Sequence, residues 1–426
     1  MTAHIFVALI VGVSILLMLI RPRNIPEFYW VGGGAILLLV FRLMPLKLAG
    51  HAITKSLDVC FFLTGMMLVS ELARETGIFD WLSSMAVRGA KGSCSRLFLL
   101  VYGIGTIVTI FMSNDATAVV LTPAILAIVR KAKVGPLPYL FACAFIANAA
   151  SFVLPISNPA NLVVFGNQVP PLGKWLLSFA IPSVFSILAT FLSIRWMFRK
   201  EMDSKFETKI EGDDTAILLT SDGRLVLSGL TLMTAVLLTA SGLGKDLGLP
   251  TCLAALAVSA TVCLKGGSDP ARLAREVSWG TLALVAALFV MVDAVQSIGG
   301  VEKARQWLVW AQNLGSHAAT FVVGFAVGVA NNLVNNLPLG LIAGDALRSA
   351  HTTGSIVDAV LIGVDLGPNL SITGSLATIL WLIALRKEKL HVTFWDFLKV
   401  GILAMPVALF ASLCGEILMR IWLPAS

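Results

Sequence analysis

Residues 97–129 read LFLLVYGIGTIVTIFMSNDATAVVLTPAILAIV, an apolar segment that Ser113-Asn114-Asp115 interrupts near its middle. Basic clusters at 88–96 and 130–133 flank this segment, and short basic loops are cytoplasmic by the positive-inside rule. A segment with both ends on one side must turn back within the membrane. Because irregular backbone at membrane depth is tolerated only beside a cavity or inside protein, we favour a re-entrant hairpin with a polar tip. Two short spans joined by a minimal outer turn are the alternative.

The composition of the whole chain is that of a membrane protein. It has 426 residues, of which 57% are hydrophobic and 13% are charged. Soluble domains contain about 25% charged residues, and helices that are apolar on every side belong in lipid. Apolar segments of about 20 residues, the length that spans a bilayer, recur throughout. The predicted fold class is therefore an all-α polytopic membrane protein.

The net charge of +7 comes from Lys and Arg in short loops between the apolar segments. Charge in that position sets the topology of a membrane protein and leaves no basic face for a polynucleotide. We therefore expect the lipid bilayer, and no nucleic acid, as the macromolecular environment of this chain.

The second half of the chain repeats the plan of the first. LVSELARETG at 68–77 resembles VMVDAVQSIG at 290–299, an offset of 299 − 77 = 222. The polar tip Asn114-Asp115 finds a counterpart in Asn335-Asn336, an offset of 335 − 114 = 221. The matching order of these landmarks predicts an internal repeat.

A second pair of interrupted segments follows the two tips. Residues 137–167 carry prolines and asparagines at their centre, which break a helix, and DLGPNLSITGS at 365–375 is the matching break. With the basic loops inside, the first half ends in the cytoplasm and the second half ends outside. The two halves are thus predicted to be inverted repeats that place a site near the membrane midplane.

The predicted organisation has about ten transmembrane helices, two re-entrant hairpins and both termini outside. The first repeat covers 1–198, with a hairpin at 97–130 and a broken helix at 137–167. A cytoplasmic linker at 199–223 separates it from the second repeat. That repeat covers 224–426, with a hairpin at 318–350 and a broken helix at 355–386.

Polar residues at the four breaks are the candidate binding residues. A broken helix exposes backbone N–H and C=O groups, and Asn, Ser and Thr side chains add donors and acceptors beside them. For any one residue, satisfying the helix end is an equally good interpretation. The candidates for substrate binding are Ser113, Asn114, Asp115, Ser157, Asn158, Asn161, Asn335, Asn336, Asn369, Ser371, Thr373 and Ser375.

Asp115 and Asp365 are the acidic residues closest to the breaks. A carboxyl at membrane depth is costly unless it is protonated, paired or hydrated, so both are candidates for proton coupling. Glu71 and Asp293 form a matching pair outside the breaks, where packing or snorkelling explains them at least as well as function.

Signatures of enzymes and cofactor sites are missing. The five His residues form no His-Glu-x-x-His pair, and Gly244-Lys245 lacks the flanking residues of a P-loop. The six Cys residues form no CxxC pair, and most lie in apolar segments. The sequence predicts a transporter without a metal or cofactor.

At these motifs the chain resembles the arsenite efflux permeases of the ArsB type, within the ion transporter superfamily. The most specific match is GVDLGPNLSITGSLATILW at 363–381. Supporting matches are Asn114-Asp115 with Leu121-Thr122-Pro123, Ser157-Asn158, and the stretch NNLP at 335–338. The resemblance covers nearly the whole chain.

The resemblance implies export of trivalent arsenic and antimony, as neutral arsenite and antimonite, from a bacterial cytoplasm across the inner membrane in exchange for protons. Two departures stand out. Ala116 follows the tip where the family often has Gly, and Asn148 stands where an acidic residue is common. The second departure leaves Asp115 and Asp365 as the stronger candidates for carrying protons.

Two alternatives remain open from the sequence. A sodium/proton antiporter or an anion carrier of the same superfamily would use the same breaks, because Asp115, Asn158 and Asp365 offer oxygen ligands for sodium. A channel subunit driven by a separate cytoplasmic ATPase, an arsenical pump partner, is the other alternative.

Overall fold

The computed structural model describes residues 2–206, 219–243, 245–265 and 268–422. These residues are helical almost throughout, and among them the only β-type pairing is an isolated bridge between Ser93 and Lys205. The first-half helices are α1 (Thr2–Ile20), α2 (Glu27–Val40), α3 (Leu46–Glu75), α4 (Ile78–Ala90), α5 (Cys94–Phe111), α6 (Asn114–Ala116), α7 (Thr122–Lys131), α8 (Leu137–Ala149), α9 (Pro159–Phe165), α10 (Leu172–Met197) and α11 (Arg199–Met202).

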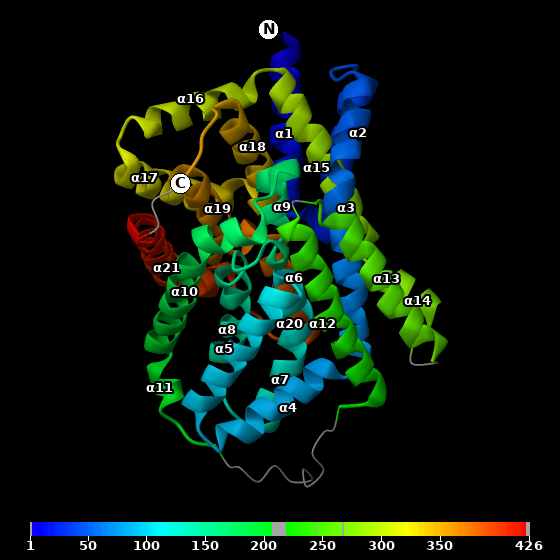
Figure 1. Ribbon diagram of the computed structural model, residues 1–426, viewed down its shortest axis with the longest axis vertical. Coiled ribbons are helices and arrows are strands. Elements are labelled where there is room, and N and C mark those ends of the chain that lie inside the picture. Colours follow the sequence, from blue (N-terminus) through cyan, green and yellow to red (C-terminus); the bar gives the residue numbers. More distant parts are fainter. Residues whose placement is uncertain (1, 207–218, 244, 266–267, 423–426) are drawn as a thin grey trace.

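The second-half helices are α12 (Ser221–Gly242), α13 (Gly248–Leu264), α14 (Pro270–Glu276), α15 (Trp279–Ser297), α16 (Gly300–Gln312), α17 (Ser316–Val334), α18 (Asn336–Ser349), α19 (Ser355–Leu366), α20 (Leu376–Lys387) and α21 (Phe394–Trp422). Figure 1 shows them gathered into one elongated bundle.

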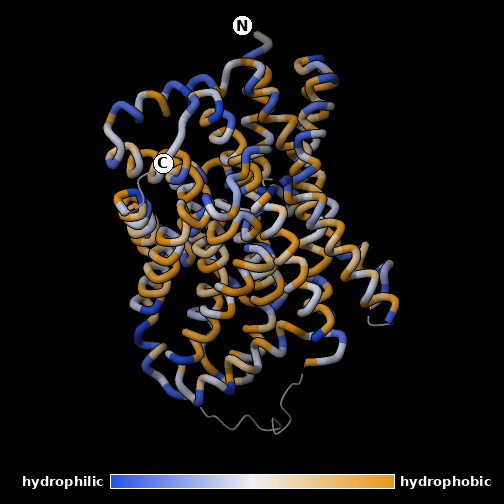
Figure 2. The backbone as a smooth tube through the Cα atoms, viewed as in Figure 1, coloured by the Kyte–Doolittle hydropathy of each residue, from blue (hydrophilic) through white to orange (hydrophobic). Residues whose placement is uncertain are grey.

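Seven described helices are long and apolar enough to cross a membrane, namely α3, α5, α10, α12, α15, α17 and α21. Shorter apolar helices occur in α1, α2, α8, α13 and α20. Figure 2 shows hydrophobic residues along the bundle and hydrophilic ones at its upper and lower ends. The predicted class, an all-α polytopic membrane protein, is confirmed.

Two pairs of helices are folded back at polar tips. Helix α5 ends before Ser113, and the chain returns through α6, a π-helical turn and α7. Cys94 at the start of α5 lines the same cavity as Ala132 and Lys133 after α7, so both ends of this hairpin meet on one side. Helices α17 and α18 make the second such pair, with Asn335 between them.

Two further pairs are halves of interrupted helices. The chain between α8 and α9 is irregular except for a 3₁₀ turn at Pro155–Ser157. Helices α19 and α20 are separated in the same way, with 3₁₀ turns at Gly367–Asn369 and Ile372–Gly374. A non-helical backbone of this kind occurs at membrane depth only where protein or a cavity surrounds it.

Equivalent features of the two halves recur at one spacing. Gly77 and Gly299 both precede a helix with left-handed backbone, and Ser113 and Asn335 both cap a helix with positive φ. Both pairs differ by 222, since 299 − 77 and 335 − 113 give that number. The structure therefore pairs Ser113 with Asn335 and Asn114 with Asn336, which corrects the predicted match by one residue.

Equivalent helices of the two halves lie at opposite ends of the bundle. Helix α4 lies at the lower end of the bundle, whereas its counterpart α16 lies at the upper end (Figure 1). An inverted relation of this kind is common among secondary transporters.

The predicted basic loops gather largely on one side. Arg195 contacts Ser95, and Ser93 pairs with Lys205, so the region 88–96 lies against the start of the linker. Arg130 Nη1 lies 2.7 Å from Glu388 Oε2, which joins two more of these loops. Residues 207–218 of the predicted linker lie outside the described residues, as do residue 1 and residues 423–426 at the termini.

Helices α10 and α21 pack closely against each other near the end of each repeat. The Ser412 hydroxyl donates a hydrogen bond of 3.0 Å to the carbonyl of Pro182 within α10. Pro182 cannot donate in its own helix and weakens the local helical bonding. The Ser412 contact with the carbonyl of Pro182 thus joins α21 to α10 at the point where the proline weakens the helix.

Candidate functional site

Four half-helices begin at the centre of the molecule, and each is capped by a predicted site residue. The caps accept hydrogen bonds from backbone N–H groups two or three residues ahead, which explains why Ser and Asn occupy these positions. The distances are 3.3 Å for Ser113, 2.9 Å for Asn158, 3.4 Å for Asn335 and 3.1 Å for Ser375.

Ser113 and Asn335 have backbone angles that residues other than glycine rarely adopt. Ser113 has φ 152° and ψ 166°, and Asn335 has φ 83° and ψ 153°. Conformations of this kind cost about 1–3 kcal/mol each and gather at functional sites. Ala116, which replaces the family's glycine, has an ordinary helical backbone, so no glycine is needed there.

A small pocket lies where the two tips meet, and we call it the tip pocket. Asn114 and Asn336 line it from the tips, and Asn158 lines it from the first broken helix. It has room for about one water molecule, about 10 Å³. The buried Oδ1 atoms of Asn114 and Asn336 have no hydrogen-bond partner within the described chain. These oxygens are acceptors that a bound group with O–H or N–H donors would satisfy.

A larger cavity of about 170 Å³, which we call the near chamber, adjoins the tip pocket. The tip pocket and the near chamber share the lining residues Leu63, Asp115, Pro159, Thr281 and Leu376. The near chamber carries the acids Glu71, which is paired with Arg74, and Asp115 and Glu276, and none of its lining residues is Lys or Arg. Its chemistry therefore disfavours a polyanionic cargo.

Asp115 lies at the junction of these two cavities. It is in the first turn of a helix, where the unpaired N–H groups favour a negative charge. Within the described residues, its carboxylate makes no hydrogen bond to another side chain. A carboxylate in this position is free to meet cargo or a proton.

Asp365 is fully buried, and both of its oxygens are engaged by the first broken helix. Ser151 Oγ donates to Oδ2 at 2.7 Å, and Asn158 Nδ2 donates to Oδ1 at 2.9 Å. Asp365 lines neither the tip pocket nor the near chamber. Asn158, which donates to Asp365 and also lines the tip pocket, connects Asp365 to that pocket.

Ser157 and Asn161 stabilise the first break by donating to backbone carbonyls. Ser157 Oγ donates to the carbonyl of Ile110 at 2.9 Å, and Asn161 Nδ2 donates to the carbonyl of Ser151 at 2.9 Å. Neither residue lines the tip pocket or the near chamber. The structure thus places both among the supports of the site.

Ser371 and Thr373 stabilise the second break through Asn332. Ser371 Oγ donates to Oδ1 of Asn332 at 2.8 Å, and Thr373 Oγ1 donates to its carbonyl at 3.1 Å. Asn335 Nδ2 in turn donates to the carbonyl of Thr373 at 3.2 Å. Sequence reasoning missed Asn332; its signal was an Asn pair at 331–332, one helical turn before the pair at 335–336.

Asn369 pairs with Asn148 across the two broken helices. Asn148 Nδ2 donates to Oδ1 of Asn369 at 2.9 Å, and Asn369 Nδ2 donates to the carbonyl of Phe145 at 3.1 Å. Both asparagines are fully buried. The residue that departs from the family pattern therefore joins the two repeats.

The described residues contain no group of three His, Cys, Asp or Glu side chains placed to hold a metal ion. The six cysteines are free, and none of them lines the tip pocket or the near chamber. Polar uncharged groups and Asp115 are what the site offers to a ligand.

Comparison with known proteins agrees with the fold. The family model described as citrate transporter, CitMHS, matches residues 3–364. An arsenical pump membrane protein of Escherichia coli strain K12 is 27% identical over 371 residues, covering 82% of this chain and 83% of its own. A putative arsenical pump membrane protein of Bacillus subtilis is 23% identical and covers 92% of this chain and 94% of its own.

The crystal structure of the Alcanivorax borkumensis YdaH transporter has a similar fold. Its TM-score to this chain is 0.53 at 13% identity, with coverage of 88% of this chain and 87% of the other. The resemblance to ArsB-type permeases of the ion transporter superfamily is confirmed by these similarities.

Proposed function

Because the chain belongs to the CitMHS family of membrane transporters, we propose that it exports trivalent arsenic and antimony, as neutral arsenite and antimonite, in exchange for protons. The chain is a transporter and not an enzyme. The arsenical pump membrane proteins that it resembles support this choice of cargo.

The observation that carries the proposal is the pair of unpartnered acceptors in the tip pocket. Arsenite is a neutral hydroxide whose O–H groups are donors, and Asn114 Oδ1 and Asn336 Oδ1 are buried acceptors without partners in the described chain. The pocket holds about one water, so the cargo would lie at its junction with the near chamber, beside Asp115.

A citrate-like cargo fits this site poorly. A tricarboxylate needs cationic or many donor groups, whereas the near chamber presents Glu71, Asp115 and Glu276 and no lining Lys or Arg. Like charges at close range disfavour such an anion. Thus the family's description as citrate transporters does not define the cargo here.

Asp115 and Asp365 remain the proposed proton-coupling residues. Asp115 lines both cavities, and Asp365 is connected to the tip pocket through Asn158. The proposed contact set for cargo is Ser113, Asn114, Asp115, Asn158 and Asn336, because these residues line the cavities. The other predicted residues support the breaks.

The direct test is uptake by everted membrane vesicles that carry the protein. With an imposed proton gradient, the proposal expects accumulation of arsenite and antimonite, measured by mass detection, and no effect of citrate. Vesicles without the protein are the control. No accumulation under the gradient would contradict the proposal.

The same assay separates the remaining alternatives. The oxygens of Asn114, Asn336 and Asp115 would also suit sodium, which prefers oxygen ligands. A sodium-dependent proton flux that is indifferent to arsenite would select a sodium/proton antiporter. Arsenite transport that survives collapse of the gradient and requires a separate ATPase would select the channel subunit.

A further inference from the structure

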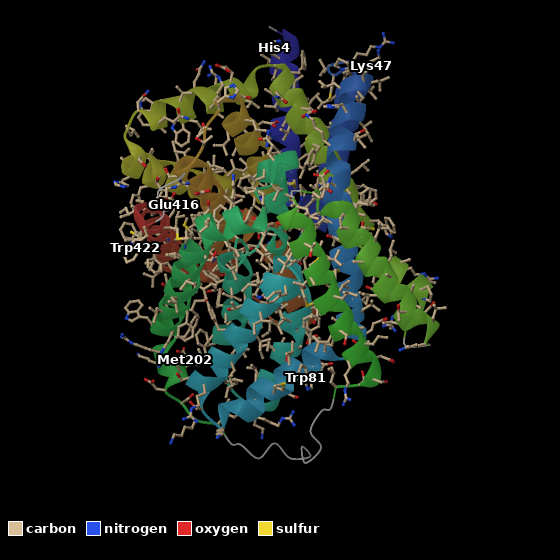
Figure 3. All side chains as sticks on the ribbon, in the orientation of Figure 1. His4, Lys47, Trp81, Met202, Glu416 and Trp422 are labelled. Carbon is tan, nitrogen blue, oxygen red and sulfur yellow. The ribbon has the colours of Figure 1, made fainter. Side chains whose placement is uncertain are left out.

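A third cavity of about 200 Å³ lies on the other side of the tip pocket, and we call it the far chamber. Its lining includes Lys55, Asp58, Phe289, Asp293, Asp345 and Arg348. Helix α3 runs from the upper end of the bundle, near Lys47, towards the lower end, near Trp81 (Figure 3). Because Lys55 lies early in α3 and Glu71 late, the two chambers lie towards opposite ends.

The far chamber is the counterpart of the near chamber under the internal repeat. Phe289 and Asp293 of the far chamber differ by 222 from Met67 and Glu71 of the near chamber, since 289 − 67 and 293 − 71 give that number. Helices α3 and α15 thus each line both chambers. The late part of α3 lines the near chamber, and the equivalent late part of α15 lines the far chamber.

One helical turn separates the far chamber from the tip pocket. In α18, Leu337 lines the tip pocket and Leu341 lines the far chamber. In α9, Pro159 lines the tip pocket and Val163 lines the far chamber. Each pair is four residues apart, which is about one turn. In this conformation the tip pocket therefore opens to the near chamber and is closed towards the far one.

Two cationic side chains join helices across the far chamber. Lys55 Nζ of α3 lies 3.4 Å from Asp293 Oδ2 of α15. Arg348 Nη1 of α18 donates to the carbonyl of Val164 in α9 at 3.0 Å. The Arg348 contact joins α18 to α9, the two helices whose turns separate the tip pocket from the far chamber. The Lys55 contact joins α3 to α15, which line the far chamber beside them.

The near chamber lacks both contacts. The position equivalent to Lys55 is Val277, and that equivalent to Arg348 is Leu126, since 277 − 55 and 348 − 126 both give 222. Glu71, the equivalent of Asp293, is instead paired with Arg74 on its own helix. Cross-helix cationic contacts at these positions are thus confined to the closed side.

We propose that the contacts of Lys55 with Asp293 and of Arg348 with Val164 latch the far side shut. Lys55 and Arg348 are positioning residues that decide to which side the tip pocket opens. The inference rests on the proposed function in one respect, namely that the tip pocket is the cargo site. Breaking the latch shifts the population of conformations towards the one that opens to the far chamber.

The test uses a variant in which all six Cys are replaced by Ser, with single reporter cysteines added. Phe289→Cys reports the far chamber, and its matched control Met67→Cys reports the near chamber. A membrane-impermeant thiol reagent is applied to right-side-out and to everted vesicles. We expect the two reporters to react from opposite sides, and reaction from the same side would overturn the assignment of the chambers.

A third reporter, Leu337→Cys, tests the latch itself. Adding Lys55→Gln or Arg348→Gln should raise its labelling rate from the far side about tenfold, within the range typical of coupling between sites. Lys55→Arg keeps the positive charge and should leave the labelling rate low. The exchanged pair, Lys55→Asp with Asp293→Lys, should return the labelling rate to the same low value. Arg74→Gln, which breaks only a contact within α3, is the matched control.

An unchanged rate in a double variant with both Lys55→Gln and Arg348→Gln would refute the latch. Labelling of Met67→Cys at its normal rate shows that each variant is folded. Because sided labelling does not depend on which cargo is carried, failure of arsenite uptake and failure of the latch are separate results.

Discussion

The side-chain amide of Asn158 donates a hydrogen bond of 2.9 Å to Oδ1 of Asp365, and Asn158 also lines the tip pocket. The buried acid of the second repeat is thereby connected to the cavity through a residue of the first repeat. An amide can either donate or accept, so protonation of Asp365 would reorient the Asn158 side chain. That reorientation would change which group of Asn158 faces the tip pocket.

Asp365→Asn should abolish proton-driven arsenite uptake while the protein still folds. The new amide can accept from Asn158 with its oxygen and donate to Ser151, whose hydroxyl also accepts. Uptake in everted vesicles and thermal unfolding in detergent measure the two effects. Normal uptake at full expression would remove Asp365 from the proton pathway.

Asp115→Asn should also abolish proton-driven uptake. It should change the free energy of unfolding less than Asp365→Asn does. The Asp115 carboxylate makes no side-chain hydrogen bond among the described residues, so stability should fall by no more than about 1 kcal/mol, the contribution of a negative charge in a first helical turn. The conservative variant Asp115→Glu keeps the charge and should retain part of the uptake. Equal uptake by Asp115→Asn and the parent would contradict its role.

Asn369→Ala should lower the free energy of unfolding by about 1–3 kcal/mol, because Asn148 and the carbonyl of Phe145 lose their buried partner. Thermal or denaturant unfolding in detergent gives the value. Ser228→Ala is the control, since that hydroxyl is exposed and bonds only to its own helix. Equal stability of both variants would show that the pair does not join the repeats.

Gly344→Ala should be destabilising by about 1–3 kcal/mol, because overpacking a close contact forces neighbouring backbone to move. A Cβ at Gly344 would lie 2.3 Å from the carbonyl oxygen of Val164, which is backbone and cannot rotate away. Gly50→Ala in α3 meets nothing within 4 Å and should be neutral or stabilising. The comparison is made by thermal unfolding.

Replacement of all six Cys by Ser should preserve arsenite transport. Trivalent arsenic binds thiols, yet no cysteine lines the tip pocket or the near chamber. Uptake by the Cys-free variant in everted vesicles measures the effect. Loss of uptake that a single restored cysteine recovers would reveal a thiol ligand.

Much of the fold was predictable from local patterns. Apolar length, the polar interruptions and the Ser and Asn caps at 113, 158, 335 and 375 follow from short-range rules of hydropathy and capping. The register of the repeat was wrong by one residue at the tip, because the two Asn-containing motifs look most alike at an offset of 221. The positive φ that Ser113 and Asn335 share shows that these two residues are the equivalent pair, at an offset of 222.

By itself, the sequence determined that this chain is a polytopic transporter with four polar breaks, because lipid demands that backbone polar groups be satisfied within each segment. Only the tertiary structure decided which polar groups face a cavity. Asp115 and Asp365 look alike in the sequence, yet one lines the cavities and the other is buried behind Asn158. The pairing of Lys55 with Asp293, 238 residues apart, likewise depends on how helices pack, and no local pattern records that.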